Sequence, residues 1–185
     1  MLLQLNFEPF PILESERLIY RKLTEDDADA IYRLRSNPDT MQFIPRPLLK
    51  TQEEAIEMIQ WINQKIAENT DINWGICKKD TGEMISFSGF YRMEPENHRT
   101  EIGYMLLPEH AGKGYVTEIV ATLLKYGFET LSLNSICAVI DPDNIASEKV
   151  LQKNNFKKEG HFKQDILFDG RFLDSVYYAI LKSEY

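Results

Sequence analysis

Apolar residues recur along this chain with two different periods, and the changes between them outline a series of helices and strands. Apolar positions three or four residues apart lie on one face of a helix, whereas alternating or continuous apolar runs of strand length indicate strands. The first pattern predicts helices over 24–35, 51–66, 116–128 and 145–153. The second pattern predicts strands over 17–23, 73–79, 84–93, 98–107, 134–140, 156–168 and 172–182.

Local signals mark where several of these elements begin and end. Thr24-Glu25-Asp26-Asp27 and Thr51-Gln52-Glu53-Glu54 resemble capping boxes, which satisfy backbone groups at the start of a helix. Asp169-Gly170 predicts a tight turn that joins the last two strands into a hairpin. The segment 37–50 contains three prolines and predicts a long loop, and we expect its part 41–49 to line a substrate entrance.

The predicted order is strand, two helices, three strands, helix, strand, helix and two strands. This order predicts an α+β fold, with a mixed, mostly antiparallel sheet of about seven strands and about four helices on its faces. A length of 185 residues favours one domain with a sizeable core. We therefore expect a single domain over 1–185, in which 1–13 is an N-terminal extension.

Composition narrows the classes of partner. The net charge of -8 disfavours non-specific binding to nucleic acid and would weakly attract cationic amines, although it also serves solubility. Cys77 and Cys137 form neither a disulfide framework nor a metal motif, and we expect both to be small buried residues. Residues 1–11 lack the pattern of a signal peptide and no apolar run is long enough for a membrane span. These features predict a cytoplasmic protein with no membrane partner.

The segment 106–118, with the sequence LLPEHAGKGYVTE, is the strongest functional signal. An apolar strand ends at Pro108, and Gly112, Lys113 and Gly114 lead into an amphipathic helix. Glycines expose backbone N–H groups, and the positive end of the helix dipole adds to them. The segment therefore favours a phosphate-bearing ligand, and a plain turn before a helix is the structural alternative.

Four segments in a fixed order resemble the GNAT acyltransferases, and more narrowly their ribosomal-protein N-terminal acetyltransferase (RimJ/RimL) branch. The segments are ESERL with RKL at 14–23, EIGY at 101–104, GKGYVTE at 112–118, and DNIAS with VL and NF at 143–156. The similarity spans about 14–182. The resemblance implies the GNAT fold, acetyl-CoA as cosubstrate, and direct attack by an amine.

The same resemblance assigns binding roles and also has exceptions. It implies that backbone amides at Met105, Leu106 and Leu107, freed by a bulge, hold the thioester oxyanion and pantetheine. It further implies that the loop holds the pyrophosphate through Gly112, Lys113, Gly114, Tyr115, Val116 and Thr117. Ala111 and Val116 depart from the usual loop pattern, and Leu151 occupies the position where many members place a tyrosine acid.

Three catalytic candidates follow. Ser147 is the candidate proton donor to the thiolate, and Asn144, one helical turn earlier, is the candidate for binding pantetheine amides. The structural alternatives are an N-cap for Asn144 and a surface position for Ser147. Glu101 is the leading candidate for the base, with a strand-edge salt bridge to Arg92 or Arg99 as the alternative, and Asp165 is the second candidate.

The remaining polar residues are assigned simpler roles. We expect His98 and His110 to be surface residues, and Asp174, which matches an aspartate of the family, to be either functional or structural. The scattered histidines and cysteines predict no metal site.

Two other functions compete with the acetyltransferase. The first is a non-catalytic acyl-CoA sensor with the same fold, which the missing tyrosine favours. The second is another nucleotide-binding module, although no GxxxxGK[ST] motif occurs. The sequence identifies neither the acceptor amine nor the choice between monomer and homodimer.

Overall fold

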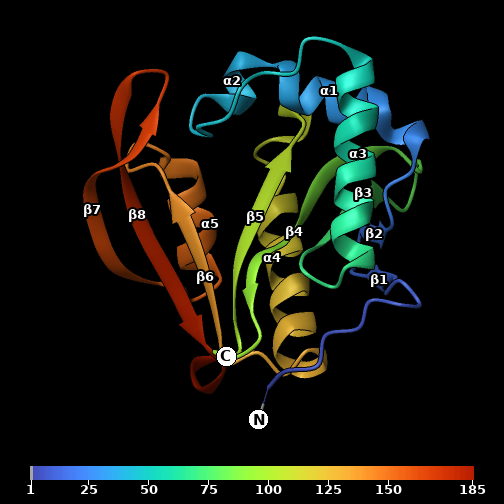
Figure 1. The fold of residues 1–185 in the computed structure, drawn as a ribbon. Coiled ribbons are helices and arrows are strands. Elements are labelled where there is room, and N and C mark those ends of the chain that lie inside the picture. Colours follow the sequence, from blue (N-terminus) through green and yellow to red (C-terminus); the bar gives the residue numbers. More distant parts are fainter. Residues whose placement is uncertain (1) are drawn as a thin grey trace.

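The computed structural model describes residues 2–185, and eight strands within them form one sheet in the order β1-β2-β3-β4-β5-β6-β8-β7 (Figure 1). The strands are β1 (Leu13–Glu14), β2 (Leu18–Arg21), β3 (Ile72–Lys78), β4 (Met84–Glu94), β5 (Arg99–Leu106), β6 (Ser135–Ile140), β7 (Lys157–Phe168) and β8 (Arg171–Leu181). Every neighbouring pair is antiparallel except β5 and β6, which are parallel. The predicted fold class, a mixed and mostly antiparallel sheet with helices on its faces, is confirmed.

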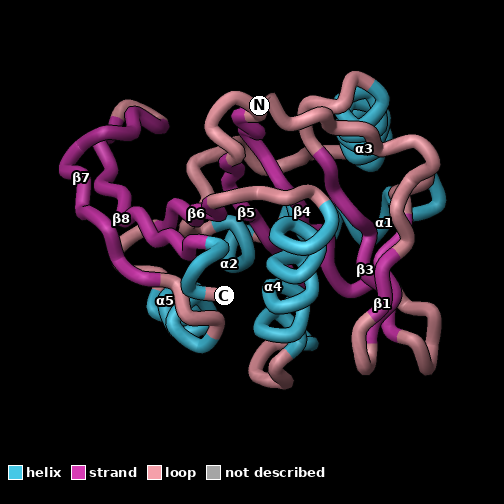
Figure 2. The backbone as a smooth tube through the Cα atoms, turned by 90° about the horizontal axis from the view of Figure 1, so that it is seen from below, coloured by secondary structure: helices cyan, strands magenta, loops and turns pink. Residues whose placement is uncertain are grey.

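The α-helices are α1 (Ala28–Ser36), α2 (Pro38–Met41), α3 (Gln52–Ala67), α4 (Tyr115–Lys125) and α5 (Ile145–Lys153). Short 3-10 turns cover Glu25–Asp27, Pro108–His110 and Lys182–Glu184, and a π-helical turn covers Tyr126–Thr130. Helix α1 packs against α3, and α4 packs against α5. Figure 2 shows α3 and α4 on opposite sides of the sheet, which places the core between the sheet and these two helix layers.

Two short elements separate the observed fold from the predicted one. Leu13 pairs with Tyr20, so the chain before the first predicted strand adds an eighth strand at the sheet edge. Asn37 caps a helical turn inside the predicted loop, because its side chain accepts hydrogen bonds from the backbone N–H groups of Asp39 and Thr40. Both elements are too short to produce a periodic pattern in the sequence.

The buried residues form one continuous cluster, and its largest fully buried side chain is Trp74 on β3. The Trp74 ring packs edge-on against Phe90 and Tyr126, and its indole N–H donates to the carbonyl of Pro11 at 2.7 Å. Cys77 and Cys137 are both buried and free, as predicted. Within the described residues, no helix combines the length and the apolarity that crossing a bilayer requires.

An ion pair between the buried Asp27 and the partly exposed Arg21 fixes the first helix to the sheet. Arg21 of β2 donates two hydrogen bonds to the carboxylate of Asp27, each 2.7 Å long, and Asp27 is only 5% exposed. The same carboxylate accepts the Thr24 N–H at 2.8 Å, which caps the helix start as the sequence pattern predicted. Burial raises the pKa of Asp27, but the hydrogen bonds from Arg21 and Thr24 outweigh burial and leave it lowered.

We expect Asp27→Asn to lower the free energy of unfolding by about 2 kcal/mol at pH 7, because it replaces the charge-assisted hydrogen bonds from Arg21 and Thr24, while the partly exposed Arg21 keeps contact with water. Since the folded-state pKa of Asp27 is lowered, its stabilisation is present above the unfolded pKa of about 4 and is lost as pH falls through the folded pKa. Chemical denaturation from pH 7 to pH 3 should show the difference between variant and wild type shrinking. Arg33→Gln, which breaks an exposed pair with Glu109, is the control and should change stability by under about 1 kcal/mol. A small, pH-independent effect of Asp27→Asn would contradict this role.

Candidate active site

The two parallel strands at the middle of the sheet separate partway along their length. β5 and β6 pair only at Arg99–Ser135, Thr100–Ile136 and Glu101–Cys137. Beyond these pairs a cleft of about 860 Å³ opens, and residues of both strands line it. Elements α1 to α3 and the loop after α2 line it on one side, and α5 with the start of α4 lines it on the other.

The direction of the β5 backbone decides which amides face this cleft. The Leu107 N–H donates to the Ile85 carbonyl at 2.9 Å, so it bonds toward β4. In an antiparallel pair the bonding direction alternates, which turns Met105 toward β4 as well and turns Tyr104 and Leu106 toward the gap. The expectation of free amides at Met105 and Leu107 is therefore wrong, and the Leu106 amide is the one of the three that faces the gap.

The predicted bulge is also absent from this stretch of β5. Within the described β4–β5 pairing, the register shift lies between Tyr91 and Glu94, at the other end of the strands. Pairing with β4 is regular from Glu101 to Leu106. The separation of β5 from β6 thus needs no bulge, because each strand keeps its outer neighbour, β4 for β5 and β8 for β6.

The glycine loop presents bare backbone at the start of α4. Gly112 and Gly114 have φ values of 74° and 78°, in the left-handed region that favours glycine. Nothing lies within 4 Å of a Cβ built on Gly112. The first helical bond joins the Glu118 N–H to the Gly114 carbonyl, so the preceding N–H groups have no partner within the helix. The loop therefore fits a phosphate group.

A carboxylate in the first turn of α4 holds this loop in place. Glu118 accepts hydrogen bonds from the Ser15 hydroxyl at 2.7 Å and from the Arg17 N–H at 2.8 Å. The Arg17 guanidinium bonds the same carboxylate at 2.7 Å and also donates to the Lys113 carbonyl at 2.9 Å. Burial raises the pKa of Glu118, but these hydrogen bonds outweigh it and leave it lowered. The motif at 14–18 thus positions the glycine loop.

The other predicted loop residues follow Ala111, which lines the cleft. The Lys113 ammonium donates to the Glu109 carbonyl at 2.9 Å, and the Tyr115 ring lies 4.3 Å from the Arg17 guanidinium. Val116 lines the cleft itself. Thr117 accepts a hydrogen bond from Asn154 at its carbonyl. Lys113 is exposed and Thr117 is only partly buried, so their side chains, as well as the backbone amides of the loop, can reach a ligand.

Ser147 is buried in the cleft wall and forms a pair that the sequence analysis missed. Its hydroxyl lies 2.6 Å from the Tyr104 hydroxyl, and both residues line the cleft. Burial raises the pKa of Tyr104 to about 12, and the hydrogen bond to Ser147 partly offsets this. Asn144 caps α5 by accepting the Ser147 N–H, and it also lines the cleft, so both roles predicted for it are compatible. Leu151 is fully buried in the core.

Glu101 lines the cleft at the point where the strands separate. Its carboxylate accepts a hydrogen bond from Arg92 at 2.9 Å, which is the salt bridge predicted as the alternative. Burial raises the pKa of Glu101, and the nearby arginines only partly oppose this effect. A carboxylate with a raised pKa in a cleft remains suited to proton transfer, so the salt bridge and the role of base are compatible.

The two hairpin aspartates lie outside the cleft. Asp165 is exposed on β7 and accepts a hydrogen bond from the Ser175 hydroxyl at 2.6 Å. Asp174 accepts the Gln164 N–H at 2.9 Å, and His161 lies 2.7 Å from it. The structure therefore does not bring Asp165 together with Glu101 and Ser147, and Asp174 stabilises the irregular hairpin.

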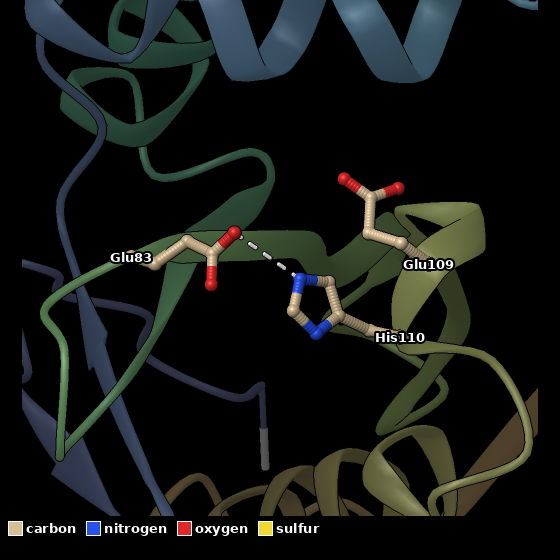
Figure 3. A group of neighbouring side chains, drawn as sticks. All are labelled: Glu83, Glu109 and His110. Atoms are coloured by element: carbon tan, nitrogen blue, oxygen red, sulfur yellow. Dashed lines mark hydrogen bonds and ion pairs between the residues drawn. The ribbon is translucent and has the colours of Figure 1, made fainter.

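A further group consists of Glu83, Glu109 and His110, whose potential ligand atoms lie within 4.8 Å of one another (Figure 3). His110 is 7% exposed, so the prediction of a surface residue is wrong. Its ring lies 3.2 Å from Glu83 and packs edge-on against Tyr115. Glu109 instead pairs with Arg33. The group thus connects the turn before β4 to the segment that precedes the glycine loop.

Comparison with known proteins identifies this arrangement. The family model for the acetyltransferase (GNAT) domain matches residues 17–157. YoaA of Bacillus subtilis (strain 168), an uncharacterized N-acetyltransferase, is 39% identical over 173 residues, which cover 94% of this chain and 98% of YoaA. The crystal structure of an acetyltransferase (GNAT family) from Bacillus anthracis matches with a TM-score of 0.84 at 30% identity, over 94% of this chain and 100% of that one.

A third match shares the fold at lower identity. RimL, a ribosomal L7/L12 alpha-N-protein acetyltransferase in complex with coenzyme A, has a TM-score of 0.84 at 24% identity, over 92% of this chain and 98% of its own. The family model covers most of the chain, and the relatives extend over nearly all of it. The separated strands and the glycine loop lie within the matched residues. The protein is therefore an acetyltransferase that belongs to the GNAT family.

Proposed function

We propose that this protein transfers acetyl from acetyl-CoA to a primary amine, on a protein N-terminus or a small molecule, by direct attack. The observation that carries the proposal is the cleft between β5 and β6, which has Glu101 and the Tyr104–Ser147 pair on its walls. The neighbour RimL, which is bound to coenzyme A in its structure, supports the donor. It also supports a place in or near the RimJ/RimL branch.

The residues present fit the donor. The amides of 112–117 would hold the pyrophosphate, since Gly112 leaves open space and the start of α4 supplies N–H groups. The Leu106 and Tyr104 amides and Asn144 would hold the pantetheine and the thioester oxygen. When bound, acetyl-CoA supplies a thioester that is open to attack by an amine.

Two groups of this chain would move protons. Glu101 would accept a proton from the incoming amine, directly or through a water molecule, because burial raises its pKa toward the working range. Tyr104 and Ser147 share a short hydrogen bond and would together supply the proton that the departing thiolate takes up. Tyr104 would thereby perform the role of the tyrosine that many family members have at the position of Leu151.

The free cysteines and the net charge bear on the compartment and the partners of the protein. Cys77 and Cys137 are free thiols, which suits a reducing compartment, and we propose the cytoplasm. We propose a monomer or a homodimer, with neither nucleic acid nor membrane as partner, in keeping with the net charge of -8.

The glycine loop is tested by Gly112→Asp. An aspartate there places a negative charge beside the expected pyrophosphate, and we expect the Kd for acetyl-CoA to rise by about 30-fold, the equivalent of roughly 2 kcal/mol. Calorimetry measures the change. Gly82→Asp is the matched control, because Gly82 has φ of 73° and equally open space but lies in the turn before β4. An equal effect of both substitutions, or of neither, would remove the loop from the site.

The base is tested by Glu101→Gln, which should lower kcat/KM by about 100-fold at pH 7. Because burial raises the pKa of Glu101 and the base must be deprotonated, wild-type kcat/KM should rise with pH through that pKa. In the variant this ionisation should vanish from the pH profile, which leaves only the ionisation of the acceptor amine, with a pKa of about 8 for a peptide N-terminus. Glu96→Gln, in the exposed turn after β4, is the control. An unchanged pH profile in Glu101→Gln would strike Glu101 from the mechanism.

The hydroxyl pair is tested by a double-mutant cycle. Tyr104→Phe and Ser147→Ala should each lower kcat by about 10-fold, because each interrupts the same proton delivery. The double variant should lose the same factor rather than the product of both, since residues that act as a unit are not additive. Steady-state kinetics with saturating acetyl-CoA measure the three values. Losses that multiply would show that the two hydroxyls act separately.

A further inference from the structure

The side of the cleft formed by α1 and the loop after α2 carries two arginines, one partly buried and one exposed, that form no ion pair within the described residues. Arg35, at the end of α1, and Arg46, in the loop after α2, both line it. Figure 1 shows α2 and this loop over the gap between β5 and β6. Within residues 2–185, neither side chain has a carboxylate within ion-pair distance.

The acidic residues in the same cleft are engaged elsewhere or exposed. Glu101 pairs with Arg92, and Asp71 accepts the backbone N–H of Arg92 at 3.0 Å. Asp39 is exposed in the first turn of α2. The charge of Arg46 acts on Glu101 and helps to oppose the rise of its pKa, but no carboxylate of the described residues lies within ion-pair distance of Arg46 or Arg35. Both guanidinium groups can therefore still bind a ligand.

Unsatisfied hydrogen-bonding groups mark the same place. Among residues 2–185, four buried side-chain atoms have no hydrogen-bond partner, and two of them, Arg35 Nε and Thr40 Oγ1, belong to residues that line this cleft. The other two belong to Asn63 and Asn73, outside the cleft. A buried guanidinium nitrogen without an acceptor is unfavourable, so an acceptor supplied by a ligand would be stabilising.

The electrostatics of Arg35 agree with this geometry. Burial lowers the pKa of the Arg35 guanidinium, and repulsion from Arg46 lowers it further. The negative charge of an anion bound between the two cations would oppose both effects, because it favours the charged form of the guanidinium. A guanidinium presents its nitrogens as a planar fork that matches a carboxylate.

We propose that Arg35 and Arg46 bind a carboxylate of the acceptor, so that the substrate is an amine that also carries a carboxylate. Thr40 supplies a further hydroxyl to the same group. Trp61, which is 50% exposed, and Phe43 line the cleft near these residues and suit an apolar group on the acceptor. The inference rests on the proposed function, since it concerns the acceptor of that reaction. A polyamine, which is cationic throughout, is disfavoured by the same residues.

Matched acceptors test the proposal. Alanyl-alanyl-phenylalanine is compared with its C-terminal amide, and phenylalanine with phenylalaninamide, which distinguishes a peptide from a free amino acid. In at least one of the two matched pairs, we expect the acid to have a kcat/KM about 30-fold above that of its amide, because a charged hydrogen-bonded pair contributes about this factor. Arg35→Gln should abolish this preference without changing the KM for acetyl-CoA, and Arg35→Lys should restore part of it. Equal use of acid and amide, or a preference for spermidine, would overturn the proposal.

Two controls separate this proposal from the proposed function. Arg33→Gln, on the same helix but facing Glu109, should keep the full preference. Binding of 3-phenylpropionate to the protein saturated with CoA can be measured without any acetyl transfer, because this acid has no amine. In the wild type it should bind about 30-fold more tightly than 3-phenylpropionamide. In Arg35→Gln the acid and the amide should bind equally. If CoA fails to bind, the proposed function fails. If CoA binds and the acid and amide bind equally, the carboxylate site alone is overturned.

Discussion

The loss of hydrogen bonding between β5 and β6 is the constraint on which the rest of the site depends. Three residue pairs hold the parallel strands together, and beyond Glu101 and Cys137 each strand keeps only its outer neighbour. The sheet is thereby divided into two halves that diverge. Backbone groups of β5 face the gap without a strand partner, and such groups bind a ligand more readily than a paired edge does.

The connections that follow these strands complete the site. β5 leads through the glycine loop into α4, and β6 leads through the turn at 141–144 into α5. Both helices therefore begin at the end of the sheet where the strands diverge. Ligands in sheets with parallel strands bind beyond the carboxyl ends of those strands, where helix N-termini converge. The carboxylate of Glu118, held by Ser15 and Arg17, fixes one of these helix starts to the edge of the sheet.

The sequence predicted what depends on neighbouring residues. Short-range patterns predicted three features that the structure shows. These are the capping box of Thr24 and Asp27, the order of the longer elements and the glycine loop. The direction of the Leu107 amide could not be predicted, because it depends on the register with Ile85. A resemblance to the family suggested free amides there, but it did not say which residues of the strand face the gap.

Long-range contacts account for the remaining misses. Tyr104 and Ser147 are separated by 43 residues, and only the packing of α5 against the sheet brings their hydroxyls together. His110 looked like a loop residue, yet Glu83 and Tyr115 enclose it. The sequence analysis assigned Arg35 no role, since basic residues are common in the last turn of a helix. Its unpartnered nitrogen is visible only once α1 is placed over the cleft.

Residue-resolved amide hydrogen exchange, measured by NMR with and without CoA, tests the central claim most directly. The account predicts that saturating CoA slows exchange by at least about tenfold at the amides of Tyr104, Leu106 and 112–117, since ligand acceptors protect them. The Leu107 amide, already bonded to Ile85, should not change. Unchanged exchange at the loop and the gap, with protection elsewhere on the molecule, would contradict the claim that the diverging strands and the glycine loop bind the donor.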